Sequence, residues 1–156
     1  MVFHLAITIA APPAVVFEVV SDILTMPRWY SAVESVQLIE GTSRSDSRYA
    51  VHRRLPTGRA RNEVRMTSYI PDAEVTFSSV SGPTPFTYRY RVAPADSGTL
   101  LRLDGSITAA GLPGAAALLS PLAEQLFGRG MQDNLRQLKA LIERNPGFAV
   151  QRRLDP

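Results

Sequence analysis

Tyrosine hydroxyls supply the first candidate chemistry in this sequence. Tyr88 and Tyr90 alternate with Phe86 and Val92 on one side of a short segment, and threonine and arginine occupy the other side. If the tyrosine side faces an enclosed apolar space, the hydroxyls need partners, and an oxygen atom of a bound molecule could supply one. The pKa of tyrosine is about 10, so these groups suit hydrogen-bond donation or acid catalysis better than base catalysis. Plain core packing, with the hydroxyls bonded to backbone or water, is an equally good interpretation.

Two asparagines are further candidates for orienting a ligand. Asn62 and Ser68 share one side of an alternating segment with apolar neighbours. That pattern suits a hydrogen bond inside a pocket, but it also suits strand ends exposed to solvent, and we expect the exposed arrangement. Asn134 lies near the apolar stripe of a helical segment, where it could point toward a ligand, although a polar residue at the edge of such a stripe is commoner.

Arg53 could supply a positive charge to the same space. It shares one side of its segment with Tyr49 and Val51, while His52 and Arg54 lie on the other side. A buried arginine is costly unless it is paired, so an inward Arg53 would indicate an acidic or enolate-bearing ligand. Because arginine is rarely buried, we expect Arg53 to lie on an outward, basic strand face instead.

Metal and nucleophile chemistry find little support in the residue types. His4 and His52 are the only histidines and have no evident carboxylate partner, which is the pattern of neither a catalytic triad nor a metal site. The chain has no cysteine, which excludes disulfides, thiolate zinc sites and cysteine nucleophiles. We therefore expect no metal and no cofactor.

The positive charge of the chain comes almost entirely from arginine. The formal net charge is +3, and the arginines around one predicted hairpin and its neighbouring strands are Arg53, Arg54, Arg59, Arg61, Arg65, Arg89, Arg91 and Arg102. Glu63, Glu74 and Asp104 on neighbouring segments can balance them, so we expect a solvated face of paired charges. No interleaved aromatic side chains support base stacking, and we expect no nucleic acid partner.

Seven segments carry the strand patterns that must position these side chains. Apolar and polar residues alternate along them, and turn-forming residues separate them. The segments are residues 2–9, 33–39, 48–55, 60–70, 74–80, 86–92 and 99–108, with a turn expected over residues 94–98. Short connections between the last six favour an antiparallel meander.

A short helix is predicted after the first strand. It starts at the prolines of residues 12–13, since proline is tolerated in the first helical turn. Pro27 limits this helix, and residues 26–30 suggest a second short turn. The apolar stripe of the helix comprises Val16, Phe17, Val20, Ile23 and Leu24.

A long amphipathic helix is predicted near the end of the chain. Apolar residues recur at spacings of three and four from Leu119 to Ile142, and residues 145–147 end the pattern. Gly128 and Gly130 lie inside it, and each should weaken the helix by about 1 kcal/mol relative to alanine. A local kink or a close backbone approach would explain both glycines.

These elements predict an α+β helix-grip fold with one or two short helices after the first strand. A curved antiparallel sheet of seven strands has one apolar face, and the long C-terminal helix is the only element able to cover it. A strongly bent sheet around one helix leaves a space between them. We expect one domain over residues 1–146 and a loose tail over residues 147–156.

No targeting or membrane-spanning segment is evident. The first nine residues alternate and lack a basic region. The longest weakly polar run, residues 109–126, contains glycine, proline and glutamate, and it suits a helix lying on a core better than a membrane span. We expect a cytoplasmic protein without stable membrane insertion, and the pattern does not determine its oligomeric state.

A family pattern runs through the first forty residues. Its residues are Ile9, Ala11, Pro12, Val16, Phe17, Val20, Asp22, Pro27, Arg28, Trp29 and Val36. This pattern resembles the START-like (SRPBCC) superfamily, particularly its polyketide cyclase/dehydrase and lipid-transport branch, and the closing helix matches in position and length. The resemblance implies a helix-grip fold around a cavity for an apolar small molecule, without a shared catalytic motif. It also places Trp29 near the cavity mouth, as a packing residue or as a wall that contacts the ligand.

The expected function is therefore binding or transport of a small hydrophobic ligand, such as a lipid or polyketide, in an internal cavity. A polyketide cyclase/dehydrase-type enzyme is one alternative, and a protein-interaction module that uses the basic outer sheet face is another. The candidate cavity residues are Trp29, Tyr49, Asn62, Val64, Met66, Phe77, Tyr88, Tyr90, Leu101, Leu103, Leu126, Met131 and Asn134.

Overall fold

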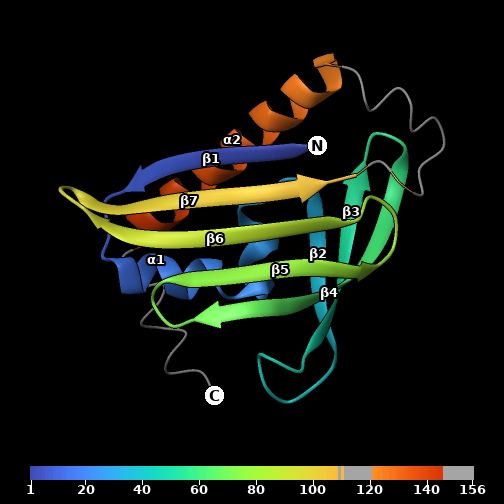
Figure 1. Cartoon of the computed structure of the whole chain (residues 1–156), viewed down its shortest axis with the longest axis horizontal. Coiled ribbons are helices and arrows are strands. Elements are labelled where there is room, and N and C mark those ends of the chain that lie inside the picture. Colours follow the sequence, from blue (N-terminus) through green and yellow to red (C-terminus); the bar gives the residue numbers. More distant parts are fainter. Residues whose placement is uncertain (109, 111–120, 146–156) are drawn as a thin grey trace.

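The computed structural model describes residues 1–108, 110 and 121–145. It contains seven strands, two α-helices and one 3-10 helix, η1, among these residues (Figure 1). In chain order they are β1 (Val2–Ile9), α1 (Pro13–Val20), η1 (Ile23–Arg28), β2 (Val33–Glu40), β3 (Arg48–Leu55), β4 (Gly58–Ile70), β5 (Glu74–Ser81), β6 (Phe86–Ala95), β7 (Gly98–Ile107) and α2 (Pro121–Arg144). The predicted tail, residues 147–156, lies outside the described residues.

The strands form one antiparallel sheet in the order β1-β7-β6-β5-β4-β3-β2. The last six strands follow one another as a meander, and β1 joins the sheet beside β7, from the Val2–Ser106 pair to the Ile9–Thr99 pair. Register shifts interrupt the β2–β3 and β4–β5 pairings. Such bulges bend a sheet locally and increase its twist, which fits the curvature seen in Figure 1. The predicted helix-grip fold is confirmed.

The two faces of the sheet differ in chemistry. The inner face, turned toward α2, carries buried apolar and aromatic side chains that include Val64, Met66, Phe77, Tyr88, Tyr90, Leu101 and Leu103. The outer face carries charged side chains from the alternate positions, such as Glu63, Arg89 and Asp104. This alternation is what a strand with one buried face requires.

The second half of α2 packs against the inner face, but the first half does not. Met131, Leu135, Leu138 and Ile142 recur at spacings of four, three and four and are almost inaccessible. In contrast, Leu122 and Leu126 are 64% and 56% exposed. In Figure 1 the first turns of α2 extend past the edge strand β1.

Gly128 and Gly130 do not mark the close backbone approach that the sequence suggested. A Cβ atom added at either position would meet no described atom within 4 Å. The helix runs continuously through both glycines, from Pro121 to Arg144. The described residues therefore leave room for a side chain at both positions, and nothing in them explains why glycine is present.

Two boundaries differ from prediction for local reasons. α1 ends at Val20 because Asp22 begins η1, where its carboxylate accepts a hydrogen bond from the Leu24 backbone N–H at 3.0 Å. As a result, Leu24 is exposed, whereas the sequence placed it on the buried stripe of the first helix. β6 continues through Pro94, which pairs with Thr99. The backbone N–H of Val92 points toward β5 and donates to the Ala73 carbonyl oxygen. Residue 94 faces the same way, but β5 does not extend that far, so a proline there, which has no N–H, costs the sheet no hydrogen bond.

None of the helices in the described part of the chain is long and apolar enough to cross a membrane.

Candidate functional site

A line of aromatic rings crosses the inner face from α2 to β3. The Phe127 ring of α2 meets the Phe3 ring at 5.3 Å between centroids, and Phe3 meets Tyr88 at 5.8 Å, both edge to face. Tyr88 then stacks on Phe86 at 4.6 Å. The Arg53 guanidinium carbon lies 5.3 Å from the centre of the Phe86 ring. We call these five residues the aromatic line; they join an exposed, apolar part of α2 to a buried charge.

Gly105 makes room for the aromatic line. It lies in β7 between Phe3 of β1 and Tyr88 of β6, which are its partners in the two pairings. A Cβ atom at this position would overlap the Phe3 ring. Glycine within a strand commonly marks such a close approach.

Tyr30 and Tyr88 place two hydroxyls beside this line. Their oxygen atoms are 3.4 Å apart, and both side chains are buried. Burial raises the pKa of both phenols, that of Tyr88 well above the ordinary value, so both stay protonated at neutral pH. Tyr88 was a sequence candidate, but Tyr30 was not. Its only sequence signal was its place beside Trp29 in the short segment of residues 26–30.

Arg53 points inward, which corrects the expectation of an outward arginine. Its side chain is only 3% exposed. Nε and Nη2 donate to Asn62 Oδ1 at 3.1 and 2.6 Å, and Nη2 also donates to the Pro83 carbonyl oxygen at 3.0 Å and to the Thr84 hydroxyl. These neutral acceptors offset part of the cost of burying the guanidinium.

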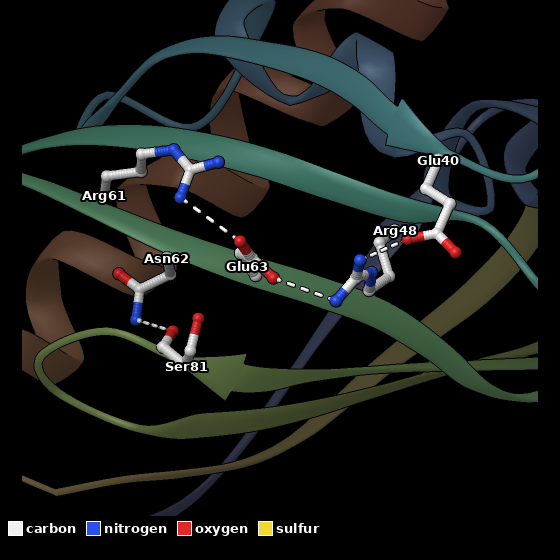
Figure 2. Close-up of polar contacts among 6 residues, drawn as sticks. All are labelled: Glu40, Arg48, Arg61, Asn62, Glu63 and Ser81. Carbon is white, nitrogen blue, oxygen red and sulfur yellow. Dashed lines mark hydrogen bonds and ion pairs between the residues drawn. The ribbon is translucent and has the colours of Figure 1, made fainter.

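Asn62 is also buried, not exposed as expected. Its side-chain amide donates to the Pro83 carbonyl at 2.7 Å and to the Ser81 carbonyl at 3.3 Å. Figure 2 shows Asn62 pointing from β4 toward Ser81, while its neighbours Arg61 and Glu63 point to the opposite face. Asn62 thus fixes the β5–β6 loop and the guanidinium of Arg53 together. Ser68, its partner in the sequence pattern, is half-buried and donates to Glu74 at 3.2 Å.

The charge of Arg53 is not neutralised by the described residues. Desolvation lowers the pKa of the guanidinium, and the groups that interact with it electrostatically are Tyr30 and Tyr88, with no carboxylate among them in the described part of the chain. At an arginine pKa above about 12, a moderate lowering leaves the group charged at neutral pH. The site therefore combines an uncompensated cation with two phenolic hydroxyls and an apolar wall.

Asn134 and Trp29 have structural partners. Asn134 is buried, and its Oδ1 accepts from the backbone N–H and hydroxyl of Ser31 at 3.1 and 3.2 Å, which ties α2 to the segment before β2. The Trp29 indole N–H donates to Thr25 Oγ1 at 3.1 Å, and its ring meets Tyr90 edge to face. Both side chains thus have partners within the fold.

The other candidates divide into core and surface. The buried candidates are Val64, Met66, Phe77, Tyr90, Leu101, Leu103 and Met131. Tyr49 is half-buried and packs against the same core. Leu126 is exposed among the described residues, so it borders the interior instead of filling it. Of the predicted site residues, Tyr88 lies within the aromatic line, and Asn62 contacts Arg53 at one end of it. Leu126 is next to Phe127, which forms the other end.

Most of the outer arginines are paired with carboxylates, as expected for a solvated face, although Arg65 and Arg102 make no ion pair with a described residue. Figure 2 shows the Glu63 carboxylate between Arg61 and Arg48, with Arg48 also reaching Glu40. The remaining outer pairs are Arg54 and Arg59 with Glu34, Arg89 with Glu74, and Arg91 with Asp104.

The histidines lie away from the aromatic line. His4 Nδ1 is 2.7 Å from Asp104 Oδ1 on the outer face, so it does have a carboxylate partner, contrary to expectation. Within residues 1–108, 110 and 121–145, no three histidine, aspartate or glutamate side chains converge in a way that could hold a metal ion.

Comparison with solved structures gives matches over almost the whole chain. A protein from Thermus thermophilus has a TM-score of 0.75 at 18% identity and covers 90% of this chain and 95% of its own. A START superfamily protein from Mycobacterium smegmatis has a TM-score of 0.74 at 14% identity, covering 92% and 97%. An aromatase/cyclase from Streptomyces sp. R1128 has a TM-score of 0.71 at 20% identity, covering 96% and 97%. At these identities the likeness establishes the fold alone.

Sequence comparison gives the family. No curated protein matches the chain closely enough to suggest an activity. The family model for polyketide cyclase / dehydrase and lipid transport matches residues 2–143, which include every strand, both α-helices up to Glu143 and the whole aromatic line. The chain therefore belongs to the polyketide cyclase / dehydrase and lipid transport family.

Proposed function

We propose that this protein binds one small apolar molecule between the inner face of the sheet and the first half of α2. The observation that carries the proposal is the aromatic line, which leads from the exposed apolar turns of α2 to a buried polar group. Small-molecule sites are mainly apolar and aromatic, with a few placed polar groups, and this arrangement has that composition. The family description, which includes lipid transport, supports the same function.

The two halves of α2 have different roles in this proposal. The second half holds the sheet through its buried stripe, from Met131 to Ile142. The first half presents Leu122, Leu126 and the half-buried Phe127. Exposed large apolar side chains next to an aromatic wall are suited to contact an apolar ligand as it enters. We propose that the ligand passes these turns and that the protein works as a cytoplasmic carrier or receptor.

The binding proposal is tested with a neutral fluorescent probe, N-phenyl-1-naphthylamine. We expect saturable binding at one probe per chain, with an emission increase as the probe leaves water. Leu126→Lys places a charge at the proposed entrance. It should lower the affinity for the probe by about five- to tenfold, the effect of about 1 kcal/mol of lost apolar contact.

Ile70→Lys is the matched control. Ile70 is 52% exposed, close to Leu126 in this respect, but it lies at the outer end of β4 opposite Glu74 and away from the aromatic line. We expect this variant to bind the probe as wild type does. Non-saturable binding of the probe, or an equal loss of affinity in Leu126→Lys and Ile70→Lys, would contradict the proposed site.

A cyclase is the second candidate function, favoured by the inward Arg53 and the tyrosine hydroxyls near it. A pocket could fold a poly-ketone chain while these groups stabilise enolates and donate protons. It ranks second because two nearby carboxylates, Glu63 and Asp104, are held by arginines on the outer face and cannot act as an internal base.

The cyclase candidate is tested with a linear poly-β-ketone thioester and analysis for an aromatic product. If the protein is a cyclase, Tyr88→Phe should lower the rate of aromatic product formation while leaving probe binding intact. Equal rates with and without protein would leave binding as the sole function.

A further inference from the structure

Arg53 is a buried cation without a counter-ion in the described part of the chain. Its three acceptors, the Asn62 amide oxygen, the Pro83 carbonyl and the Thr84 hydroxyl, are all neutral. Both arginines drawn in Figure 2, in contrast, have carboxylate partners. An arginine removed from water normally requires a paired anion, because hydrogen bonds to neutral groups offset only part of the desolvation cost.

The hydrogen bonds of Arg53 leave one nitrogen unused. Nε and Nη2 make all of the hydrogen bonds recorded for this side chain, and Nη1 donates to none of the residues that the structure describes. A purely structural arginine that joins β3, β4 and the β5–β6 loop would need no more than the two nitrogens already engaged. The free Nη1 is therefore available to a group that the protein itself does not provide.

Tyr30 and Tyr88 add donors of the right kind next to the guanidinium. The guanidinium lies over the Phe86 ring, on which Tyr88 stacks, and the Tyr88 hydroxyl makes a long hydrogen bond of 3.4 Å with the Tyr30 hydroxyl. A weak hydroxyl pair can turn one O–H toward an incoming oxygen at little cost. Since burial raises the pKa of both phenols, both retain the proton that they would donate.

We propose that Arg53, with the hydroxyls of Tyr30 and Tyr88, forms a head-group site for the carboxylate of an apolar ligand. The carboxylate accepts from Nη1 and from a tyrosine hydroxyl, and the hydrocarbon part lies along Phe86, Tyr88, Phe3 and Phe127. Charge-assisted hydrogen bonds of this type are stronger than neutral ones, and the low-dielectric surroundings strengthen them further. This inference rests on the proposed ligand site and specifies which class of molecule occupies it.

Two ligands that differ only in the head group test the proposal. Decanoate and decan-1-ol are compared for displacement of N-phenyl-1-naphthylamine at pH 8, where decanoate is charged. We expect decanoate to bind at least about tenfold more tightly than the alcohol, as one charged hydrogen bond is worth about 1.5–3 kcal/mol. Equal affinities, a preference for the alcohol, or no displacement by decanoate would overturn the proposal.

Arg53→Gln should abolish this preference, with the affinity of each ligand measured against the variant's own affinity for the probe. The matched control is Arg54→Gln, which makes the same charge change one residue away on the outer face, where Arg54 pairs with Glu34. We expect the control to retain the preference, so a change in net charge alone cannot explain the result. A preference that survives Arg53→Gln would exclude Arg53 as the anion site.

Tyr30→Phe covers the possibility that Arg53→Gln fails to fold. Phenylalanine keeps the ring and its packing against Trp29 and Tyr88, and it removes only one hydroxyl. We expect decanoate affinity to fall about threefold to tenfold, with decan-1-ol and probe affinities less affected. An unchanged ratio of the two ligand affinities in Tyr30→Phe would remove the tyrosine from the site.

The neutral probe keeps the two proposals apart. If the probe binds saturably and the head groups are not distinguished, the apolar site stands and the carboxylate proposal fails. If the probe does not bind, the proposed ligand site itself fails, and the carboxylate proposal fails with it.

Discussion

Gly105 shows how one missing side chain shapes the inner face. The Phe3 ring lies across Gly105, in the space that a Cβ atom would occupy, and reaches Tyr88 on the next strand. An aromatic residue over a strand glycine covers the backbone that the glycine exposes. The position of Phe3, and with it the contact to Phe127, therefore depends on Gly105.

Gly105→Ala should destabilise the fold by about 1–3 kcal/mol, the usual cost of forcing an extra methyl group into a packed core. The free energy of unfolding in urea measures the effect. Ser106→Ala, at the next position of β7 and half-buried, should change it little. Phe3→Leu combined with Gly105→Ala should cost less than the sum of the single changes, because a shorter side chain relieves the overlap. Strict additivity would show that Phe3 is not what the new methyl group meets.

Single residues were the least predictable part of the site. Alternation placed Arg53 and Asn62 on the sides of their strands that turned out to face inward, but arginine is so rarely buried that the outward orientation was expected. What stabilises the inward orientation is the β5–β6 loop, which brings the Pro83 carbonyl and the Thr84 hydroxyl to the guanidinium. A contact between residues about thirty positions apart leaves no local pattern in the sequence, and the same is true of Tyr30 with Tyr88.

Elements were predicted far better, since most strands have one buried face; in β2 only Val33 is buried. Alternation together with the turn residues between segments identified all seven strands, and the ends differ by three residues or fewer. The largest difference is the extension of β6 through Pro94, which depends on where the neighbouring strand β5 ends. Strand identity is thus set by local alternation, whereas strand ends depend on neighbours that a local pattern does not contain.

The first half of α2 carries two glycines, Gly128 and Gly130, at which an added Cβ atom would meet no described side chain or neighbouring element within 4 Å, so alanine should be accepted there. Gly128→Ala and Gly130→Ala should each raise the free energy of unfolding by up to about 1 kcal/mol, because alanine restricts the helix backbone more than glycine does. Urea unfolding measures this, with helix content followed by circular dichroism. A loss of stability in either variant would mean that the glycine makes a close contact or a bend that the fold needs.

The whole molecule separates its charges between two faces. On the outer face most arginines pair with carboxylates. On the inner face, Arg53 has no carboxylate partner among the described residues. Paired surface charges contribute little each at neutral pH, and salt screens them. Their summed contribution is therefore expected to be visible as a loss of stability at acid pH, where the carboxylates lose their charge.

Stability should fall as the pH drops below about 5. Hydrogen bonds from basic side chains are the main cause of lowered pKa values in four carboxyls, and the pairs are Glu34 with Arg54, Glu74 with Arg89, Asp104 with His4 and Glu143 with Lys139. Hydrogen bonds from Ser43 lower the pKa of a fifth carboxyl, Asp46. In the unfolded chain these groups titrate at about 4, so between that value and the lower folded-state pKa the unfolded chain binds more protons. The stabilisation is thus present above the unfolded-state pKa and is lost as the pH falls through the folded-state values.

Urea unfolding at pH 7, 5, 4 and 3 in low salt measures this dependence. Asp104→Asn removes one of the four groups and the charge that His4 and Arg91 share. This variant should be less stable than wild type at pH 7 and should approach wild-type stability at pH 3, where the wild-type carboxyl is itself increasingly protonated. A difference between variant and wild type that stays constant from pH 7 to pH 3 would mean that Asp104 acts through its shape and packing and not through its charge.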